Sequence, residues 1–249
     1  MSDFGFQVHA AWVVAKKNAM VYYLKPPVFT FGLIFPFFFY LAFAAGHRAA
    51  PEALAPGIVA MALFFTASAV GPLVTPWERQ ARTYERLVTS PASLVAILGG
   101  DMLAGAAFGV VLVLLPLVFV GLFTDAHIAA AMPLAVGIVA GALAFAALGV
   151  LLAAPATEGP SQVMMLSNLV RLPLIFVSGV FVPLDEMSAW SQWLAPLSPL
   201  SYAADLIRMG FGEAGYWSQS GDALALIAFA VVFVTLASVL HQRTRSGAL

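Results

Sequence analysis

Six long apolar stretches dominate this sequence, and they leave such a chain few ways to fold. Each is near the length of about 20 residues that an α-helix needs to cross a bilayer. They cover residues 28–45, 56–74, 94–123, 129–154, 162–182 and 222–240. Only 9% of the residues are charged, against about 25% in soluble domains. We therefore expect an all-α integral membrane protein, with residues 1–249 forming one transmembrane domain of six helices.

Lys and Arg favour the cytoplasmic side of a membrane protein, so their placement predicts its orientation. With both termini inside, the outer side holds only Arg48 and Arg208. The cytoplasmic side then holds Lys16, Lys17, Lys25, Arg79, Arg82, Arg86, Arg243 and Arg245. The opposite orientation would require all eight of these cations to be translocated. We expect a multi-pass protein of the cell membrane with both termini in the cytoplasm.

Residues 1–25 precede the first apolar stretch and have the pattern of a helix that lies in the membrane interface. Apolar side chains recur along one side, and the cations and Asn18 lie elsewhere. The apolar side consists of Phe4, Val8, Trp12, Ala15 and Ala19. This pattern is typical of an interface helix. The alternative is an amphipathic lead-in that does no more than anchor the chain.

The segment between the second and third stretches has the signals of a short cytoplasmic helix over residues 76–90. Thr75 and Glu78 have capping-box spacing, and Pro76 occupies the first helical position. Ser90 and Pro91 supply the stop. A solvated linker is the alternative, but a linker needs neither a start signal nor a stop signal.

The segment 183–216, on the predicted outer side, contains two short helical patterns. They cover Leu184–Leu194 and Leu200–Phe211, and neither is long enough to cross a bilayer. Trp190, Trp193 and Tyr202 are residue types that favour the membrane interface. We expect a re-entrant helical pair in the outer leaflet before the last span. A pair of helices lying on the surface fits the same pattern.

Several kinds of chemistry are excluded by what the chain contains. The net charge of −1 argues against nucleic-acid binding, which needs clustered cations. There is no Cys, and no phosphate-binding loop or metalloprotease motif occurs in the sequence. The four histidines are isolated from one another, so we expect no metal site and no catalytic residues.

Asp101 and Arg171 are the ionisable residues that fall inside the predicted spans. Charges at this depth are costly and face the protein interior by default. We predict that the two form an intramembrane ion pair, within one subunit or across a dimer. The alternative is that Arg171 extends to the cytoplasmic surface while Asp101 is hydrated there.

Four features of the chain resemble the permease subunits of type-two ABC exporters, which export drugs, polysaccharides and lipids. The first two are the entry YYLKPPVFTFGLIFP and the cytoplasmic stretch ERQARTYERLVTSP. The third, VSGVFVPLDEMSAWSQWLAPLSPLSYAADLIR after the fifth span, is similar to the family signature. The fourth is the plan of six spans with both ends inside. Arg82 departs from the family pattern, in which many members have Gly.

The resemblance implies a mechanism in which this chain does not hydrolyse ATP itself. It implies two permeases around a central path, the second an identical copy or a homologue, with two ATPase subunits that bind ATP and Mg beneath them. Helix 76–90 would dock in the ATPase through Glu78, Arg79, Arg82, Thr83, Glu85, Arg86 and Leu87. The outer pair would form a gate that includes Pro183, Trp190, Trp193, Pro196, Pro199, Tyr202 and Arg208.

Two other functions remain as alternatives. An ion-coupled secondary transporter tends to have carboxylates near the midplane and internal repeats, and neither is evident here. A membrane enzyme that modifies lipids would need a polar catalytic cluster at the interface. The apolar spans favour an amphipathic substrate such as a drug, a lipid or a glycolipid.

Overall fold

The computed structural model describes residues 3–21, 30–46, 51–83, 89–155 and 159–246, and within these ranges the chain forms helices and no strand. The helices are α1 (Asp3–Val21), η1 (Thr30–Ile34), α3 (Phe35–Gly46), α4 (Pro51–Ser68), α5 (Val70–Gln80), α7 (Leu94–Leu112), α8 (Leu114–Phe123), α9 (Ala131–Leu152), α10 (Pro160–Phe176), η2 (Leu184–Glu186), α11 (Ala189–Leu194), η3 (Ala195–Leu197), α12 (Pro199–Gly210) and α13 (Gln219–Ser246).

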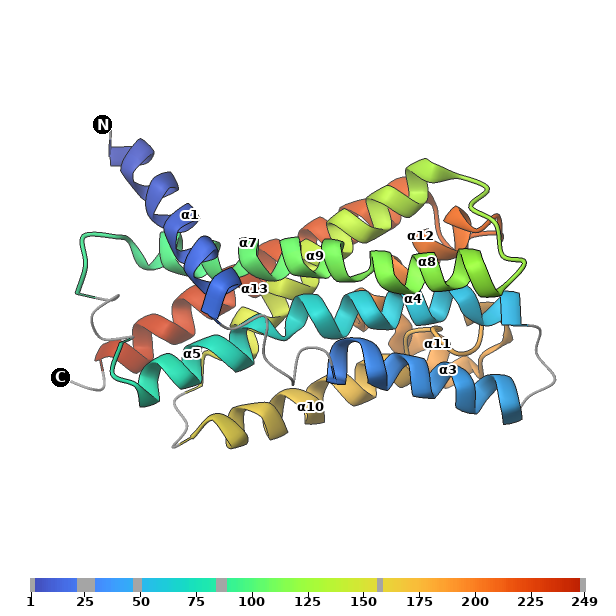
Figure 1. The fold of residues 1–249 in the computed structure, drawn as a ribbon, viewed down its shortest axis with the longest axis horizontal. Coiled ribbons are helices and arrows are strands. Elements are labelled where there is room, and N and C mark those ends of the chain that lie inside the picture. The colour runs from blue at the N-terminus through green and yellow to red at the C-terminus, as the bar shows by residue number, and fades with distance from the viewer. Residues whose placement is uncertain (1–2, 22–29, 47–50, 84–88, 156–158, 247–249) are drawn as a thin grey trace.

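The long helices form a bundle along the longest axis of the molecule (Figure 1). Helix α1, the end of α5 and both termini lie at one end of this bundle, whereas α11 and α12 lie at the opposite end. This polarity agrees with the sequence prediction, which placed the cytoplasmic helix and the pair 183–216 on opposite sides of the membrane.

Four helices in the described ranges are long and apolar enough to cross a membrane, judged by length and composition. They cover Glu52–Gln80, Leu94–Phe123, Ala131–Leu152 and Gln219–Gln242. The prediction of an all-helical membrane protein is confirmed, and the count of six spans stays a prediction. Helix α7 begins at Leu94, where Ser93 caps it by accepting a hydrogen bond from the Ala96 amide at 3.1 Å.

The helix at the position of the predicted fifth span is shorter than the sequence predicted. Helix α10 has 17 residues and ends at Phe176, whereas the prediction extended to residue 182. The chain turns at Gly179, whose φ is +75°, a conformation that side chains other than glycine rarely adopt. The apolar residues after Phe176 therefore belong to a turn packed against the bundle, which hydropathy alone does not distinguish from a helix.

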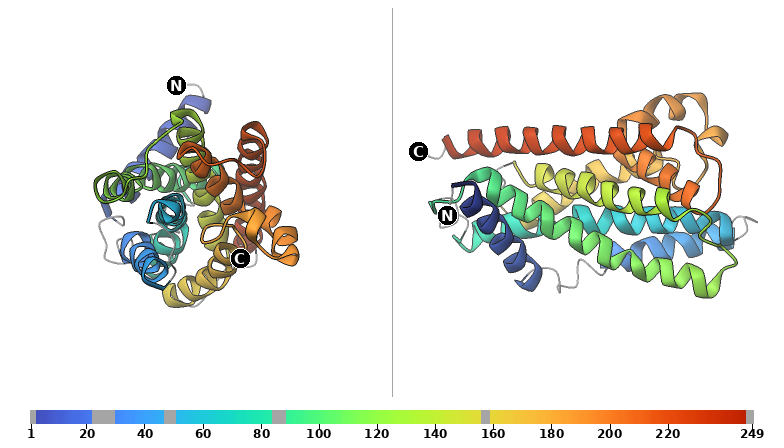
Figure 2. Two further views of the ribbon diagram at one scale, coloured as in Figure 1. Left: turned by 90° about the vertical axis from the view of Figure 1, so that its right-hand side faces the viewer. Right: turned by 90° about the horizontal axis from the view of Figure 1, so that it is seen from above.

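The core is centred on α4, which lies in the middle of the bundle (Figure 2). It packs against α3, α7, α9 and α12. The continuous stretch Glu52–Gln80 joins α4 to α5, and its most apolar 18-residue window is wholly buried. Phe64 and Phe65 are among its largest buried side chains, and the ring of Phe64 meets that of Phe145 edge to face at 5.0 Å. In contrast, α13 packs on α9 and α12 at the periphery.

Candidate coupling site and outer pocket

The predicted cytoplasmic helix is a continuation of the second span. Helix α5 begins at Val70 and passes through Thr75 and Pro76, both of which are buried inside it. The expected cap at Thr75 is therefore wrong, because the chain is already helical from Val70 onward. The start of the predicted helix 76–90 therefore lies inside α5, which runs from the interior of the bundle to one end of the bundle.

Helix α5 ends ten residues before the predicted stop at Ser90, in a Schellman motif. The Thr83 amide donates to the Glu78 carbonyl at 2.9 Å, and the Arg82 amide donates to the Arg79 carbonyl at 3.0 Å. Arg82 has a φ of +55° and occupies the position where glycine is usual. Thr89–Ser93 is not helical, and Glu85, Arg86 and Leu87 lie outside the described residues.

The end of α5 is exposed and is called the coupling tip, residues 77–83, below. Trp77 is 45% exposed, and the side chains from Gln80 to Thr83 are also exposed. Arg79 donates to the Pro155 carbonyl at 3.0 Å, which ties the tip to the chain that follows α9. The tip is thus an exposed surface on a helix whose remainder is buried.

Two neighbouring residues of α1 bind two buried acids, one within the coupling tip and one on α7. Lys17 forms an ion pair with Glu78 of α5, and Asn18 donates to the Asp101 carboxylate of α7 at 2.5 Å. Glu78 is 4% exposed and Asp101 is 3% exposed. Sequence reasoning found both acids but missed their partners. The available signal was that a buried carboxylate needs a donor, and that Lys17 and Asn18 are adjacent polar residues on a helix at the same end.

The structure does not bring Asp101 and Arg171 together within the subunit. Asp101 accepts its hydrogen bond from Asn18, whereas Arg171 donates to the main-chain carbonyl of Ser68. Arg171 is 2% exposed, so it lies in the protein interior and does not extend to the surface. A contact between the two across a dimer stays a prediction.

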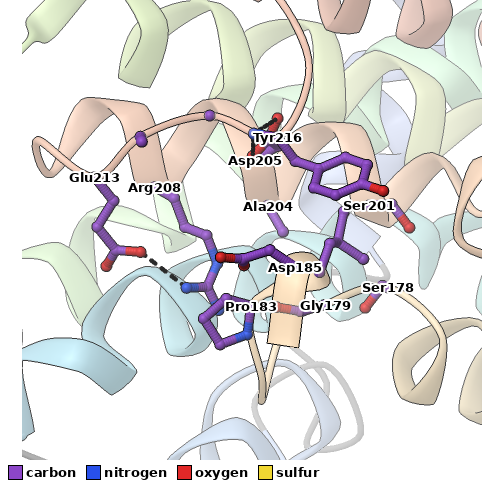
Figure 3. A pocket seen from close by; sticks show the side chains of 13 residues that line it. Ser178, Gly179, Pro183, Asp185, Ser201, Ala204, Asp205, Arg208, Glu213 and Tyr216 are labelled. Atoms are coloured by element: carbon purple, nitrogen blue, oxygen red, sulfur yellow. Dashed lines mark hydrogen bonds and ion pairs between the residues drawn. The ribbon is translucent and has the colours of Figure 1, made fainter. Parts of the chain in front are cut away.

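A pocket of about 230 Å³ lies at the opposite end of the bundle (Figure 3). It is enclosed by the turn after α10, by α12 and by the loop that follows α12. Its polar lining residues include Ser178, Asp185, Ser201, Asp205, Arg208 and Glu213. Of the outer residues predicted from the sequence, Pro183 and Arg208 line this pocket.

Arg208 and Asp205 on α12 hold the walls of the pocket in place. The Arg208 guanidinium donates to Glu213 at 2.9 Å and to the Gly179 carbonyl at 2.8 Å. The Asp205 carboxylate accepts from the Tyr216 and Trp217 amides, each at 2.9 Å. Since each side chain satisfies groups on another segment, α12 is the element that joins both loops at this end.

The other predicted outer residues lie around α12 rather than in the pocket. Trp190 and Trp193 are exposed on α11, and Pro199 is the first residue of α12. The Tyr202 ring stacks on Trp217 at 4.6 Å, and its hydroxyl donates to the Pro196 carbonyl at 3.2 Å. Burial and, second, the charge of Asp222 raise the pKa of the Tyr202 phenol. This hydroxyl therefore stays a donor.

Asp222 is a residue whose environment the sequence did not indicate. It lies at the start of α13 and is fully buried, and neither of its carboxylate oxygens meets a hydrogen-bond donor. Its polar neighbour is the Asp205 carboxylate. Within the part of the chain that the structure describes, no three His, Cys, Asp or Glu side chains form a group suited to a metal ion.

The structure places the exposed end of α5 near both termini, and it places α11 and α12 at the opposite end of the bundle. The family model described as ABC-2 type transporter matches residues 9–212, which is most of the chain. The chain belongs to the ABC-2 type transporter family. The matched residues of this ABC-2 permease run from α1 to the start of the loop after α12, so they include the coupling tip and the part of the outer pocket that lies before Glu213.

A curated relative agrees with this assignment. The chain is 28% identical over 228 residues to the daunorubicin resistance ABC transporter permease protein DrrB1 of Streptomyces coeruleorubidus. The match covers 88% of this ABC-2 permease and 77% of the relative. The family consists of transport permeases, so the protein is a multi-pass transport subunit and not itself an enzyme.

Proposed function

We propose that this ABC-2 permease forms the membrane path of an ATP-driven exporter and is moved by a separate ATPase bound at the coupling tip. The observation that carries the proposal is the tip itself. Trp77, Gln80 and Thr83 are exposed at the end of a helix that is otherwise buried. A rigid element of this kind transmits a displacement at its end into the core, because packed interiors deform little.

The assembly that we propose has two permeases and two ATPase subunits. Membership of the ABC-2 family supports this stoichiometry. The ATPases would bind on the side that holds α1, the coupling tip and both termini (Figure 1). The excess of Lys and Arg in these segments supports a cytoplasmic location for that side, in the cell membrane. ATP and Mg would be bound by the ATPase subunits.

The substrate that we propose is an amphipathic molecule, either a drug or a lipid-like compound. The printed name of the relative from Streptomyces coeruleorubidus refers to resistance to daunorubicin, which supports a drug. The apolar surfaces of the spans are consistent with substrates that enter from the bilayer. The outer helices α11 and α12 would close the path on the far side.

The experiment that tests this proposal places a bulky side chain on the coupling tip. In Ala81→Trp, the new ring stands on an exposed residue at the end of α5. Ala45→Trp is the matched control, because Ala45 is also exposed but lies on α3 toward the opposite end, outside the helices proposed to close the path. Both variants are expressed with the cognate ATPase, and co-purification, ATP hydrolysis and uptake into inverted vesicles are measured.

We expect Ala81→Trp to lower co-purification and substrate-stimulated ATP hydrolysis by roughly tenfold, as for a disrupted interface hot spot. Ala45→Trp should retain both. Equal activity of the two variants would remove the tip from the coupling role. Uptake by the purified permease alone, driven by an ion gradient, would contradict the ATP-driven mechanism itself.

A further inference from the structure

The second span contains a main-chain carbonyl that its own helix leaves without a partner. Ser68 is the last residue of α4, and α5 begins at Val70. In a continuous helix the Ser68 carbonyl would accept from the amide of residue 72, but that residue is Pro72 and has no N–H. The junction between α4 and α5, residues 68–70, is called the break below. A carbonyl buried in a membrane protein needs another donor.

Arg171 of α10 supplies this donor. Its guanidinium donates to the Ser68 carbonyl, and its side chain is among the largest that are fully buried. A buried cation at membrane depth requires hydrogen-bond acceptors. The Ser68 carbonyl is such an acceptor, and the Arg171 guanidinium is the donor that this carbonyl lacks. Arg171 therefore connects the fifth span to the point where the second span is interrupted.

Helix α9 encloses the break from another side. A Cβ atom on Gly149 would lie 2.5 Å from the Ser68 carbonyl oxygen, so the two backbones are already in contact. Ser68 is itself fully buried. Because α9 and α10 both meet the break, a displacement of α5 is felt by both helices. The contact with α9 is packing, whereas the contact with α10 is a charged hydrogen bond that specifies a fixed position along the helix.

We propose that Arg171 is the positioning residue that makes α10 follow the coupling tip, through its bond to the Ser68 carbonyl at the break. The proposal rests on the proposed function, because it concerns how a displacement at the ATPase reaches the fifth span. The break lies on the same helix pair as the tip, and α10 packs against α5. The proposal requires the bond to Ser68 and is compatible with further contacts of the guanidinium.

The experiment separates this role from a contribution to folding. One substitution removes the Arg171 donor, and the other supplies the Ser68 carbonyl with a donor from its own helix. Arg171→Met removes the guanidinium and keeps an unbranched apolar chain. Pro72→Ala gives residue 72 an N–H, so the Ser68 carbonyl regains its helical partner. The single variants and the double variant are reconstituted with the ATPase. Thermal stability, ATP hydrolysis and substrate transported per ATP are then measured for each.

We expect Arg171→Met to lower stability, and Pro72→Ala with Arg171→Met to regain it. Transport per ATP should fall by about fivefold in both, at the low end of coupling between distant sites. It should stay at the parent level in Pro72→Ala alone. Parent-level coupling in the double variant, failure of that variant to fold, or a full loss already in Pro72→Ala would overturn the proposal.

A distance measurement gives an independent result. The chain has no Cys, so spin labels at Gln80→Cys and Leu169→Cys report on the tip and α10 alone. Both parent side chains are exposed. Labelled permease is diluted with an excess of unlabelled permease, so that distances between the two subunits do not contribute. We then expect one narrow distance that is kept on nucleotide trapping, and a broad distribution after Arg171→Met. An unchanged narrow distance after that substitution would contradict the inference. Absence of ATPase binding to the parent permease would instead contradict the proposed function.

Discussion

Lys17 of α1 and Glu78 of α5 form an ion pair that joins the amino-terminal helix to the base of the coupling tip. The Glu78 side chain is 5% exposed and that of Lys17 is 32% exposed, so the acid is the buried partner. The next residue, Asn18, binds the buried Asp101 carboxylate of α7. Helix α1 is therefore fixed to two helices of the bundle by polar contacts, in addition to its apolar packing.

Lys17→Ala should destabilise the protein, because it leaves the buried Glu78 carboxylate without its cation. Breaking a fully buried pair costs about 3–5 kcal/mol, and partial exposure of Lys17 reduces this to roughly 1–2 kcal/mol. Adding Glu78→Gln should recover most of the loss. Lys16→Ala is the control, since Lys16 is exposed. Thermal unfolding in detergent measures each variant, and equal effects at Lys16 and Lys17 would refute the prediction.

Two adjacent glycines of α7 should respond differently to alanine. A Cβ on Gly100 would lie 2.6 Å from the Ala11 carbonyl oxygen of α1, whereas a Cβ on Gly99 meets nothing within 4 Å. Gly100→Ala should therefore displace α1, and Gly99→Ala should leave it in place. The reporter is a cysteine at Ala15, which is 7% exposed in the parent.

With Ala15→Cys as the only thiol, maleimide labelling should be faster with Gly100→Ala than with Gly99→Ala. Gly99→Ala should also stabilise α7 by about 0.5–1 kcal/mol, because alanine loses less backbone entropy than glycine in a helix. Equal labelling rates in the two backgrounds would show that α1 does not depend on this close approach.

Arg82→Gly should stabilise the end of α5. Arg82 has a φ of +55°, and the left-handed conformation costs a residue with a Cβ about 1 kcal/mol. Arg82→Ala keeps the Cβ and should show no such gain. Hydrogen exchange at the Thr83 amide, which donates to the Glu78 carbonyl, reports on the turn. Slower exchange in the glycine variant than in the alanine variant is expected, and the reverse order would disprove a strained turn.

Asp222→Asn should raise thermal stability. The Asp222 carboxyl group is buried against that of Asp205 with no other donor beside it, so the pair has to hold a proton, whereas an asparagine amide donates to Asp205 without taking up a proton, a gain of about 1 kcal/mol. Asp205→Asn should lower stability, because the charged acceptor of the Tyr216 and Trp217 amides is lost. Asp125→Asn, at an exposed position, is the control. If Asp205→Asn were thermally more stable than Asp222→Asn, the prediction would be wrong.

The placement of helices followed from the sequence where the membrane alone dictates the structure. The long spans were predictable because every main-chain polar group in a bilayer must be satisfied within a helix. On α1, the predicted apolar side is exposed at Phe4, Val8 and Trp12. Ala15, which belongs to the same predicted side, is instead buried against α5 and α7 residues. The periodicity of apolar residues predicted the helix, but it did not predict which side of the helix packs against the bundle.

The candidate site was harder to predict because it depends on residues that act outside their usual roles. Arg82 occupies a position where glycine would have signalled the helix end, so the predicted helix ran to residue 90. Pro72 lies inside the predicted second span, and nothing in its neighbourhood indicates that Arg171, far along the chain, supplies the missing donor. Such pairs arise from packing between helices, which the hydropathy of each span does not encode.

The enclosure of α4 has a consequence for how the lipid environment acts on this protein. The most apolar window of Glu52–Gln80, which includes much of α4, is wholly buried, whereas that of Gln219–Gln242 in α13 is 11% buried. Hydrophobic mismatch acts on surfaces that touch acyl chains. A thinner or thicker bilayer therefore tilts α13 before it alters α4, and α13 packs against α12. Membrane thickness would then tune the far end of the permease while leaving its central helix unchanged.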